Sequence, residues 1–186
     1  MSNVVGIAGA LRQGSYNRAL LRAAVESAPP GMTIAIHTLD AIPLYNGDVE
    51  AAGIPAPVTA LKEAIRAADG LLILTPEYNH GMPGVLKNAV DWLSRPPKPQ
   101  AFDATPVAIG GATPGGFGTR GSQYQLRQCL TPLNAFVMPQ PSLMLAGAQE
   151  KFDGTPALID PKTRETLQRF LAGFAAWIAR LGSPQT

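Results

Sequence analysis

Residues 70–95 read GLLILTPEYNHGMPGVLKNAVDWLSR and contain one complete strand–turn–helix unit. The opening run, residues 70–74, is apolar without polar alternation and too short for a helix, so it predicts a strand covered on both faces. Residues 83–94 predict a helix, because apolar side chains return there every three or four positions. These apolar positions are Val85, Leu86, Ala89, Val90 and Leu93. A buried strand followed by an amphipathic helix is the repeating unit of a parallel sheet.

The same alternation continues on both sides of this unit. Apolar runs predict strands at residues 3–9, 32–38, 70–74 and 106–109, and a fifth strand at 136–138 and 142–145, interrupted by Pro139 and Pro141. Helices are expected over about 13 residues from Tyr16 and at 57–68, 83–94, 123–134 and 162–181. This order predicts an α/β protein with a doubly wound parallel sheet. We expect one domain, residues 1–186, with long Pro-bearing loops at 43–57 and 96–106.

The composition excludes several classes of protein. The net charge of +2 comes without any block of basic residues, so no nucleic-acid partner is expected. The one cysteine, Cys129, cannot form an internal disulfide, and His37 and His80 are too far apart to predict a metal site. The first 15 residues contain neither a basic start nor a long apolar run. We therefore expect a cytoplasmic protein that does not enter a membrane.

Ligands of such sheets bind outside the carboxyl ends of the strands, and the first loop at this edge reads GALRQGSYN, residues 9–17. Ser15 or Asn17 would cap the following helix, whose first N–H groups favour an anion. Arg12 adds a forked cation, and Gly14 lets a ligand approach the backbone. The loop therefore predicts a site for a terminal phosphate monoester. The alternative is an ordinary capped helix with a solvated arginine.

Two common phosphate-binding motifs do not fit this first loop. It lacks the G-K-[ST] end of a Walker A sequence, and its glycines, Gly6, Gly9 and Gly14, do not have the spacing of a dinucleotide fingerprint. A mononucleotide phosphate is the better interpretation.

The second and third loops predict a place for a flat ring. Tyr78, within Pro76-Glu77-Tyr78-Asn79, offers an apolar face, and N–H groups of a tight turn can meet the polar edge of a planar ligand. A lone loop histidine such as His80 is more often solvated than catalytic. Trp92 lies off the apolar stripe of its helix and predicts a partly buried or dimer contact. The third loop, residues 110–118, reads GGATPGGFG and would either receive the ring or be a flexible surface loop.

The segments LRQGSYN and PEYNHGMPGVLKNAVDWLSR resemble the two signature regions of the NAD(P)H-dependent FMN reductases. The third loop and the following SQYQLRQCL are also similar to this flavodoxin-like family, which includes chromate and quinone reductases and azoreductase-type enzymes. One departure is Ala10, where many relatives carry serine, so one hydroxyl contact to the phosphate is absent. The resemblance implies a three-layer sandwich with a five-stranded parallel sheet in the order 2-1-3-4-5.

The resemblance also implies cofactor-binding residues. Gly9 and its neighbours Leu11, Arg12, Ser15, Tyr16 and Asn17 would hold the phosphate of FMN. The residues Pro76, Glu77, Tyr78 and Asn79 would line the isoalloxazine, largely through backbone groups. Gly111 would approach the pyrimidine side or the ribityl chain. No catalytic side chain and no metal are implied, because the flavin carries the electron chemistry.

The activity implied by the resemblance is a ping-pong reaction. NAD(P)H would deliver hydride to FMN and leave, and a small-molecule acceptor would then be reduced: a quinone, a nitro- or azo-aromatic, chromate or free flavin. The family is usually dimeric or tetrameric, and Gln123, Tyr124 and Arg127 resemble positions linked to tetramer contacts. Two alternatives stay open. A flavodoxin-like electron carrier would usually be strongly acidic, unlike this chain, and a phosphate-binding hydrolase or sensor would leave loops two and three unused.

Overall fold

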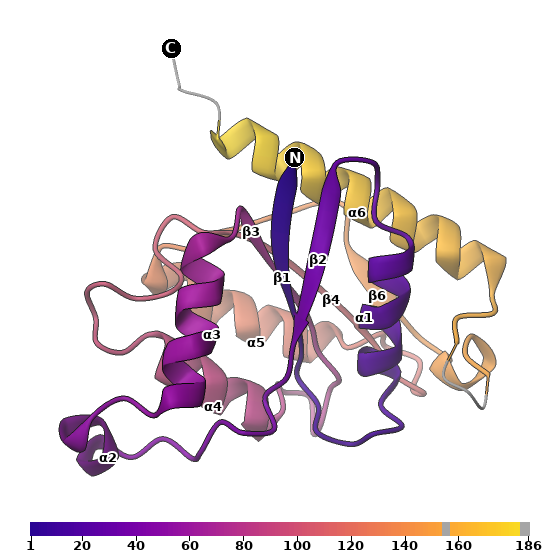
Figure 1. Ribbon diagram of the computed structural model, residues 1–186. Coiled ribbons are helices and arrows are strands. Elements are labelled where there is room, and N and C mark those ends of the chain that lie inside the picture. The colour runs from indigo at the N-terminus through magenta and orange to yellow at the C-terminus, as the bar shows by residue number, and fades with distance from the viewer. Residues whose placement is uncertain (154–156, 183–186) are drawn as a thin grey trace.

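A parallel sheet forms the centre of the computed structural model, which describes residues 1–153 and 157–182 (Figure 1). Its long strands are β1 (Ser2–Ala8), β2 (Met32–His37), β3 (Gly70–Leu74) and β4 (Pro106–Ala112). The short strands β5 (Phe136–Val137) and β6 (Leu143–Leu145) complete it. The order is β2-β1-β3-β4-β5, with β6 also paired to β4, and every pair is parallel. The predicted α/β class and strand order are confirmed.

The fifth position of the sheet differs from the single interrupted strand that was expected. β5 pairs with the beginning of β4, where Pro106 faces Phe136, and β6 pairs with its end, where Gly110 faces Leu143. Proline has no N–H to donate to a ladder, so the segment between these strands, which contains Pro139 and Pro141, leaves the sheet. The sheet therefore has six strands in five positions.

Helices cover both faces of the sheet and give three layers (Figure 1). One face packs against α1 (Tyr16–Glu26) and α6 (Pro161–Gly182), and the other against α3 (Ala56–Ala67), α4 (Gly84–Leu93) and α5 (Arg120–Leu130). Neighbouring strand residues point to opposite faces, so Leu72 joins the α1/α6 core and Leu71 the α3/α4/α5 core. Each central strand is thus buried on both sides, which explains its continuous apolar sequence.

Several boundaries differ from those expected. β4 extends beyond residue 109 to Ala112, and α5 covers residues 120–130 rather than 123–134. A 3-10 turn, Thr131–Leu133, follows α5 and contains Pro132. A short helix, α2 (Gly47–Ala52), lies in the loop expected at residues 43–57. Another 3-10 turn spans Ala148–Glu150.

Trp92 corrects another expectation, because its side chain is fully buried within the chain. The indole Nε1 donates to the carbonyl oxygen of Pro43 at 2.8 Å, and Asn88 Nδ2 donates to the same oxygen at 2.8 Å. Asn88 Oδ1 also accepts from the backbone of Tyr45 at 2.7 Å. Trp92 therefore fastens the segment before α2 to α4; it is a packing residue, but it is fully buried and not partly buried as expected.

Candidate functional site

The three loops singled out in the sequence meet at one edge of the sheet, where β1, β3 and β4 end. The N–H of Gly9 donates to Leu74 at 2.8 Å, and the N–H of Thr75 donates to Gly110 at 2.9 Å. These bonds continue the ladder beyond the strand ends, so the three loops begin side by side. The site is consequently assembled on the hydrogen-bonded ends of three neighbouring strands.

Ser15 is the N-cap of α1. Its backbone is extended, and its buried Oγ accepts from the N–H groups of Asn17 at 3.2 Å and Arg18 at 3.5 Å. Of the two N-cap candidates, Ser15 is therefore the one that caps. The first turn of α1 points its N–H groups toward the loop, where they favour a negative charge.

Arg12 and Leu11 lie exposed on the same loop. Within the described part of the chain, the Arg12 guanidinium has neither a hydrogen-bond nor an ion-pair partner. A free forked donor beside a helix N-terminus is suited to a phosphate dianion. Tyr16 packs its ring against Phe152, with the ring centres 5.8 Å apart, and its backbone N–H lies in the first turn of α1.

Asn17 connects the first loop to the third. Its buried side chain donates from Nδ2 to the carbonyl of Ala112 at 2.8 Å, and Oδ1 accepts from the N–H of Ala112 at 2.9 Å. The amide is thus fully engaged by the end of β4. Its predicted phosphate contact stays a prediction, and the backbone N–H is the group that would make it.

The second loop is a two-residue hairpin. The backbone groups of Tyr78 and Gly81 exchange hydrogen bonds of 3.0 and 3.1 Å. The residues between them, Asn79 and His80, have φ of 51° and 61°, values that asparagine and histidine tolerate better than most residues. No hydrogen bond from the described residues engages the N–H groups of these two, so they are available to the edge of a planar ligand.

Helix α5 holds this hairpin in place. Glu77 Oε2 accepts from the N–H of Ser122 at 3.1 Å, in the first turn of α5, where a carboxylate also complements the helix dipole. Gln125 Oε1 accepts from the N–H of Met82 at 2.6 Å. His80 Nδ1 lies 3.6 Å from Glu77 Oε1, and its ring is exposed. The Glu77 carboxylate therefore holds the turn against the first turn of α5.

The third loop begins in a place where only glycine fits. A Cβ on Gly111 would lie 2.1 Å from the carbonyl oxygen of Thr75 and 2.3 Å from Thr119 Oγ1. Gly111 is therefore required for the close approach of β4 to the end of β3. Its predicted contact with the ribityl chain or pyrimidine stays a prediction.

A cleft of about 330 Å³ lies between the hairpin and the third loop. Tyr78, 57% exposed, lies on the hairpin, and Phe117, 74% exposed, lies in the cleft lining on the third loop. Aromatic surface of this kind can stack on a flat ligand. The cleft-lining residues are Glu77, Asn79, His80, Thr113, Gly115, Phe117 and Thr119.

A larger hollow of about 1060 Å³ lies at the opposite edge of the sheet, beside Pro106 and residues 94–101. Its cations are Arg66, Arg95 and Lys98. The carboxyl ends of α3 and α4 meet there, and helix carbonyls disfavour an anion. Lys62 Nζ in fact donates to the carbonyl oxygen of Arg95 at 2.5 Å. This hollow is not the site that the three loops form.

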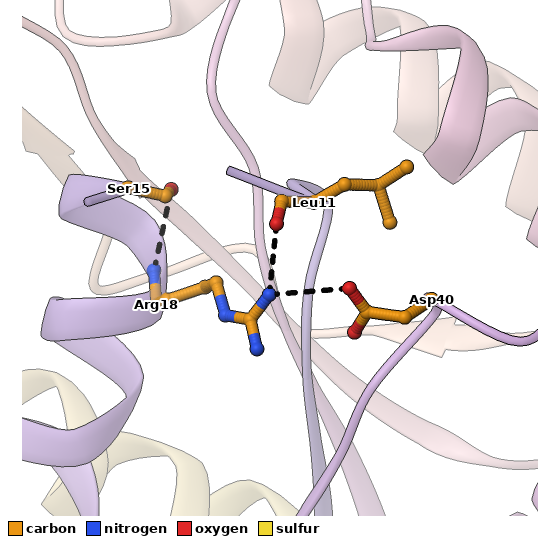
Figure 2. Close-up of polar contacts among 4 residues, drawn as sticks. All are labelled: Leu11, Ser15, Arg18 and Asp40. Atoms are coloured by element: carbon orange, nitrogen blue, oxygen red, sulfur yellow. Dashed lines mark hydrogen bonds and ion pairs between the residues drawn. The ribbon is translucent and has the colours of Figure 1, made fainter. Parts of the chain in front are cut away.

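Two residues of the site were not predicted from the sequence. Gln125 is one, and Arg18 is the other: its Nη1 lies 2.9 Å from the Leu11 carbonyl oxygen and 3.4 Å from Asp40 Oδ1 (Figure 2). A cation in the first turn of a helix opposes the dipole, and this mismatch could have indicated that Arg18 has a fixed partner.

Gln123 corrects the expectation of a subunit contact. Its side chain is fully buried, and Nε2 donates to Leu143 O and Thr119 Oγ1, each at 3.0 Å. It therefore holds β6 and the third loop within one chain. Tyr124 is exposed, and Arg127 Nη1 donates to the carbonyl oxygen of Met138 at 3.0 Å.

The topology and the site together define a class of protein. A parallel sheet in the order 2-1-3-4-5, with a capped helix N-terminus after the first strand at the switch point, is the flavodoxin-like arrangement that binds FMN. Residues 2–150 match the family model of the NADPH-dependent FMN reductases. The chain belongs to this family of oxidoreductases, which use FMN and NAD(P)H.

Relatives resemble this chain over almost its full length. It is 50% identical over 178 residues, 96% of each chain, to an NAD(P)H-dependent FMN reductase of Pseudomonas aeruginosa. It is 44% identical over 181 residues, 96% of each chain, to a quinone reductase of Escherichia coli (strain K12). Among solved structures, the flavoenzyme NAD(P)H:(acceptor) oxidoreductase FerB of Paracoccus denitrificans matches with a TM-score of 0.89 and 31% identity, covering 98% of this chain and 100% of that one.

The residues at the carboxyl edge fit FMN chemically. The phosphate requires several donors, and the α1 N-terminus and Arg12 offer them. The ring requires a flat apolar surface beside hydrogen-bonding groups. The exposed rings of Tyr78 and Phe117 offer the first, and the free N–H groups of the hairpin offer the second. In the described ranges no three His, Cys, Asp or Glu side chains come together as a metal site, and no helix has the length and apolar content to cross a bilayer.

Proposed function

We propose that this chain is an NAD(P)H-dependent, FMN-containing reductase that reduces quinones and related acceptors in a ping-pong cycle. The observation that carries the proposal is the junction of a capped anion loop, a braced tight turn and an open cleft at one sheet edge. Bound FMN would supply the hydride chemistry, taking hydride from NAD(P)H and passing reducing equivalents on to the acceptor. The protein would bind, orient and partly desolvate the reacting rings.

The residues would divide this work between the two ends of FMN. Arg12 and the N–H groups around Ser15–Asn17 would hold the phosphate, supported by Gly9 and Leu11. The turn at Pro76–Asn79 would present backbone groups to the ring edge, and Tyr78 would cover part of its face. Gly111 would leave the backbone of β4 close to the ribityl side.

An exposed site suits several flat acceptors. Tyr78 and Phe117 leave large aromatic surfaces in solvent, and Phe117 helps to line the cleft beside the hairpin. Quinones, nitro- and azo-aromatics and free flavin could all stack there, and chromate could enter without steric selection. One relative is named 2-hydroxy-1,4-benzoquinone reductase, which supports quinones as the first class to assay.

The test is a two-step rapid-mixing experiment on the purified FMN-loaded protein. Anaerobic mixing with NADPH or NADH should bleach the flavin directly, and a second mixing with 1,4-benzoquinone should restore its absorbance. Steady-state rates measured at several concentrations of NADPH and of quinone would support the ping-pong order if their double-reciprocal plots give parallel lines. Bleaching only after a partner reductase is added would instead support the flavodoxin-like carrier. A protein that retains no FMN would overturn both.

We further propose that residues 1–186 act as one FMN-binding domain in a cytoplasmic homodimer or homotetramer. Tyr124 exposes its ring, and burial lowers the pKa of the Arg127 guanidinium, which has no carboxylate partner among the described residues. A carboxylate from another subunit would offset that cost of burial. Light scattering of wild type and Arg127→Ala would test this, with a smaller assembly expected for the variant.

A further inference from the structure

Arg18 connects Leu11, seven residues before it, to Asp40, 22 residues after it (Figure 2). It belongs to the first turn of α1, where its N–H points to the Ser15 cap, and its side chain turns back over the loop. One nitrogen, Nη1, contacts both Leu11 O at 2.9 Å and Asp40 Oδ1 at 3.4 Å. The side chain is only 18% exposed, so this arrangement is held by packing as well as by polar contacts.

Charge alone does not explain this arrangement. A cation at the amino end of a helix is disfavoured by the helix dipole. The pair with Asp40 offsets that cost, but Asp40 is 44% exposed, and an exposed ion pair contributes little to stability. What the pair does is fix the direction of the guanidinium, so that Nη1 stays beneath the carbonyl of Leu11.

The bond to Leu11 also sets the direction of the next N–H group. The peptide between Leu11 and Arg12 is trans, so its C=O and N–H point in opposite directions. With the carbonyl of Leu11 turned toward Arg18, the N–H of Arg12 faces away from it. No group in the described part of the chain accepts from this N–H. The loop is therefore held with a free N–H three residues before the N-cap Ser15, where the helix N-terminus favours an anion.

We propose that Arg18 is a positioning residue for the cofactor phosphate, acting through the Leu11–Arg12 peptide, with Asp40 fixing its guanidinium. The inference rests on the proposed placement of the FMN phosphate at loop one. Preorganisation of this kind lowers the entropy lost on binding, so removing Arg18 weakens only the ligand that uses the loop. FMN and riboflavin differ only by the phosphate, which makes them a matched pair of probes.

The experiment is a titration of the apoprotein with FMN and with riboflavin, followed by quenching of flavin fluorescence. For Arg18→Met we expect the Kd for FMN to rise about tenfold, because the loop would then have to be ordered on binding, and the Kd for riboflavin to change less than about twofold. The control is Arg22→Met. It removes the same charge one helical turn away, from an exposed side chain that has no described bond to the loop, and should leave both Kd values near wild type.

Asp40→Asn distinguishes positioning from simple attraction by the sign of its effect. If Arg18 acts by positioning, loss of the Asp40 charge loosens the guanidinium and raises the Kd for FMN. If Arg18 acts only as a distant positive charge, loss of a nearby negative charge lowers that Kd. Circular dichroism melts show whether each apoprotein is folded. If Arg18→Met is unfolded, the FMN and riboflavin titrations of Asp40→Asn test the proposal instead.

Three results would overturn the inference: an unchanged ratio of FMN to riboflavin affinity in Arg18→Met, an equal loss in Arg22→Met, or tighter FMN binding in Asp40→Asn. Measurements on the wild-type protein show separately whether the proposed function itself fails. If the wild-type protein binds no FMN, or binds FMN and riboflavin equally, the proposed phosphate site itself is wrong. If the wild-type protein prefers FMN and Arg18→Met keeps the same preference, only the role of Arg18 is wrong.

Discussion

Backbone groups at the site are satisfied by single polar side chains from other parts of the chain. Asn17 pairs with both backbone groups of Ala112, and Glu77 accepts from Ser122. A buried polar group without a partner costs about 1–3 kcal/mol, so each of these side chains stabilises a particular loop geometry. Arg12 differs from them because its guanidinium has no partner among the described residues. That difference makes Arg12 the residue whose removal should affect ligand binding more than folding.

Arg12→Ala is expected to weaken FMN binding by about 1.5–3 kcal/mol, the range of a hydrogen bond to a charged group. Stability of the apoprotein should stay near wild type, since the side chain is exposed and makes no described contact. Flavin titration and chemical denaturation measure the two quantities. Arg12→Lys keeps the charge without the fork and should fall between wild type and the alanine variant. An unchanged FMN affinity in Arg12→Ala would show that the phosphate role is wrong.

Gly111→Ala is expected to destabilise the fold by about 1–3 kcal/mol, because the new methyl group would meet the Thr75 carbonyl and Thr119 Oγ1. Gly116→Ala is the matched control, since a Cβ on Gly116 meets nothing within 4 Å. Urea denaturation of the two apoproteins should therefore separate them clearly. Equal midpoints would mean that β4 can move away from β3 at little cost.

Helix α5 shows how one element can shape a site that it does not itself form. Its first turn receives Glu77, its second turn holds Met82 through Gln125, and Gly121 lets the carbonyl of His80 approach. A Cβ on Gly121 would lie 2.6 Å from that carbonyl oxygen. The hairpin is thus fixed from outside, although its own turn residues are already suited to positive φ.

Helix α6 gives a prediction about pH. Asp160 precedes its first residue, Pro161, and accepts from both the N–H and the hydroxyl of Thr163. These two hydrogen bonds lower the pKa of Asp160 below its ordinary value of 3.8. A carboxylate whose pKa is lower in the folded state than in the unfolded state stabilises the folded protein. This stabilisation is complete at a pH above the unfolded-state pKa, and it is lost as the pH falls through the folded-state pKa.

Asp160→Ala should therefore be less stable than wild type at pH 7, and the difference should shrink as the pH falls below 3.8. Urea denaturation at a series of pH values measures it. Asp160→Asn is the control, because its amide oxygen can still cap the helix but does not titrate. A difference between wild type and Asp160→Ala that is the same at every pH would contradict the assignment.

At the scale of the whole molecule, FMN bound as proposed would bridge loops that follow three different strands, so binding should stabilise the entire fold. A ligand at 100 times its Kd adds about 2.7 kcal/mol, which for a chain of this length corresponds to roughly 5–10 °C in Tm. Thermal melts of apoprotein with and without FMN measure the shift. Riboflavin at the same concentration should give a smaller shift, and equal shifts would argue against phosphate recognition.

Elements of this fold could be predicted because each carries its own local signal. The run at residues 70–74 is buried on both faces and reads as apolar throughout, and α6 shows its buried stripe at Leu167, Phe170, Leu171 and Phe174. Predictions failed for side chains whose hydrogen-bond partners lie in distant segments of the chain. Trp92 lies off the stripe of α4 because the segment at Pro43 covers it, and Gln123 turns inward because β6 presents a carbonyl to it.

The sequence by itself determined the strand–helix order of a doubly wound sheet and the three loops that meet at the carboxyl edge, while the flavodoxin-like class came from the family resemblance. Their signals are local in the chain: period, cap and turn residues. Only the tertiary structure decided which polar groups are free. Asn17 and Ala112 are 95 residues apart, and Glu77 and Ser122 are 45 apart. Strand order and register decide which of these distant groups meet. Arg12 and Asn17 were both predicted to bind phosphate from the same loop, but in the described part of the folded chain Arg12 is free and Asn17 is bonded to Ala112.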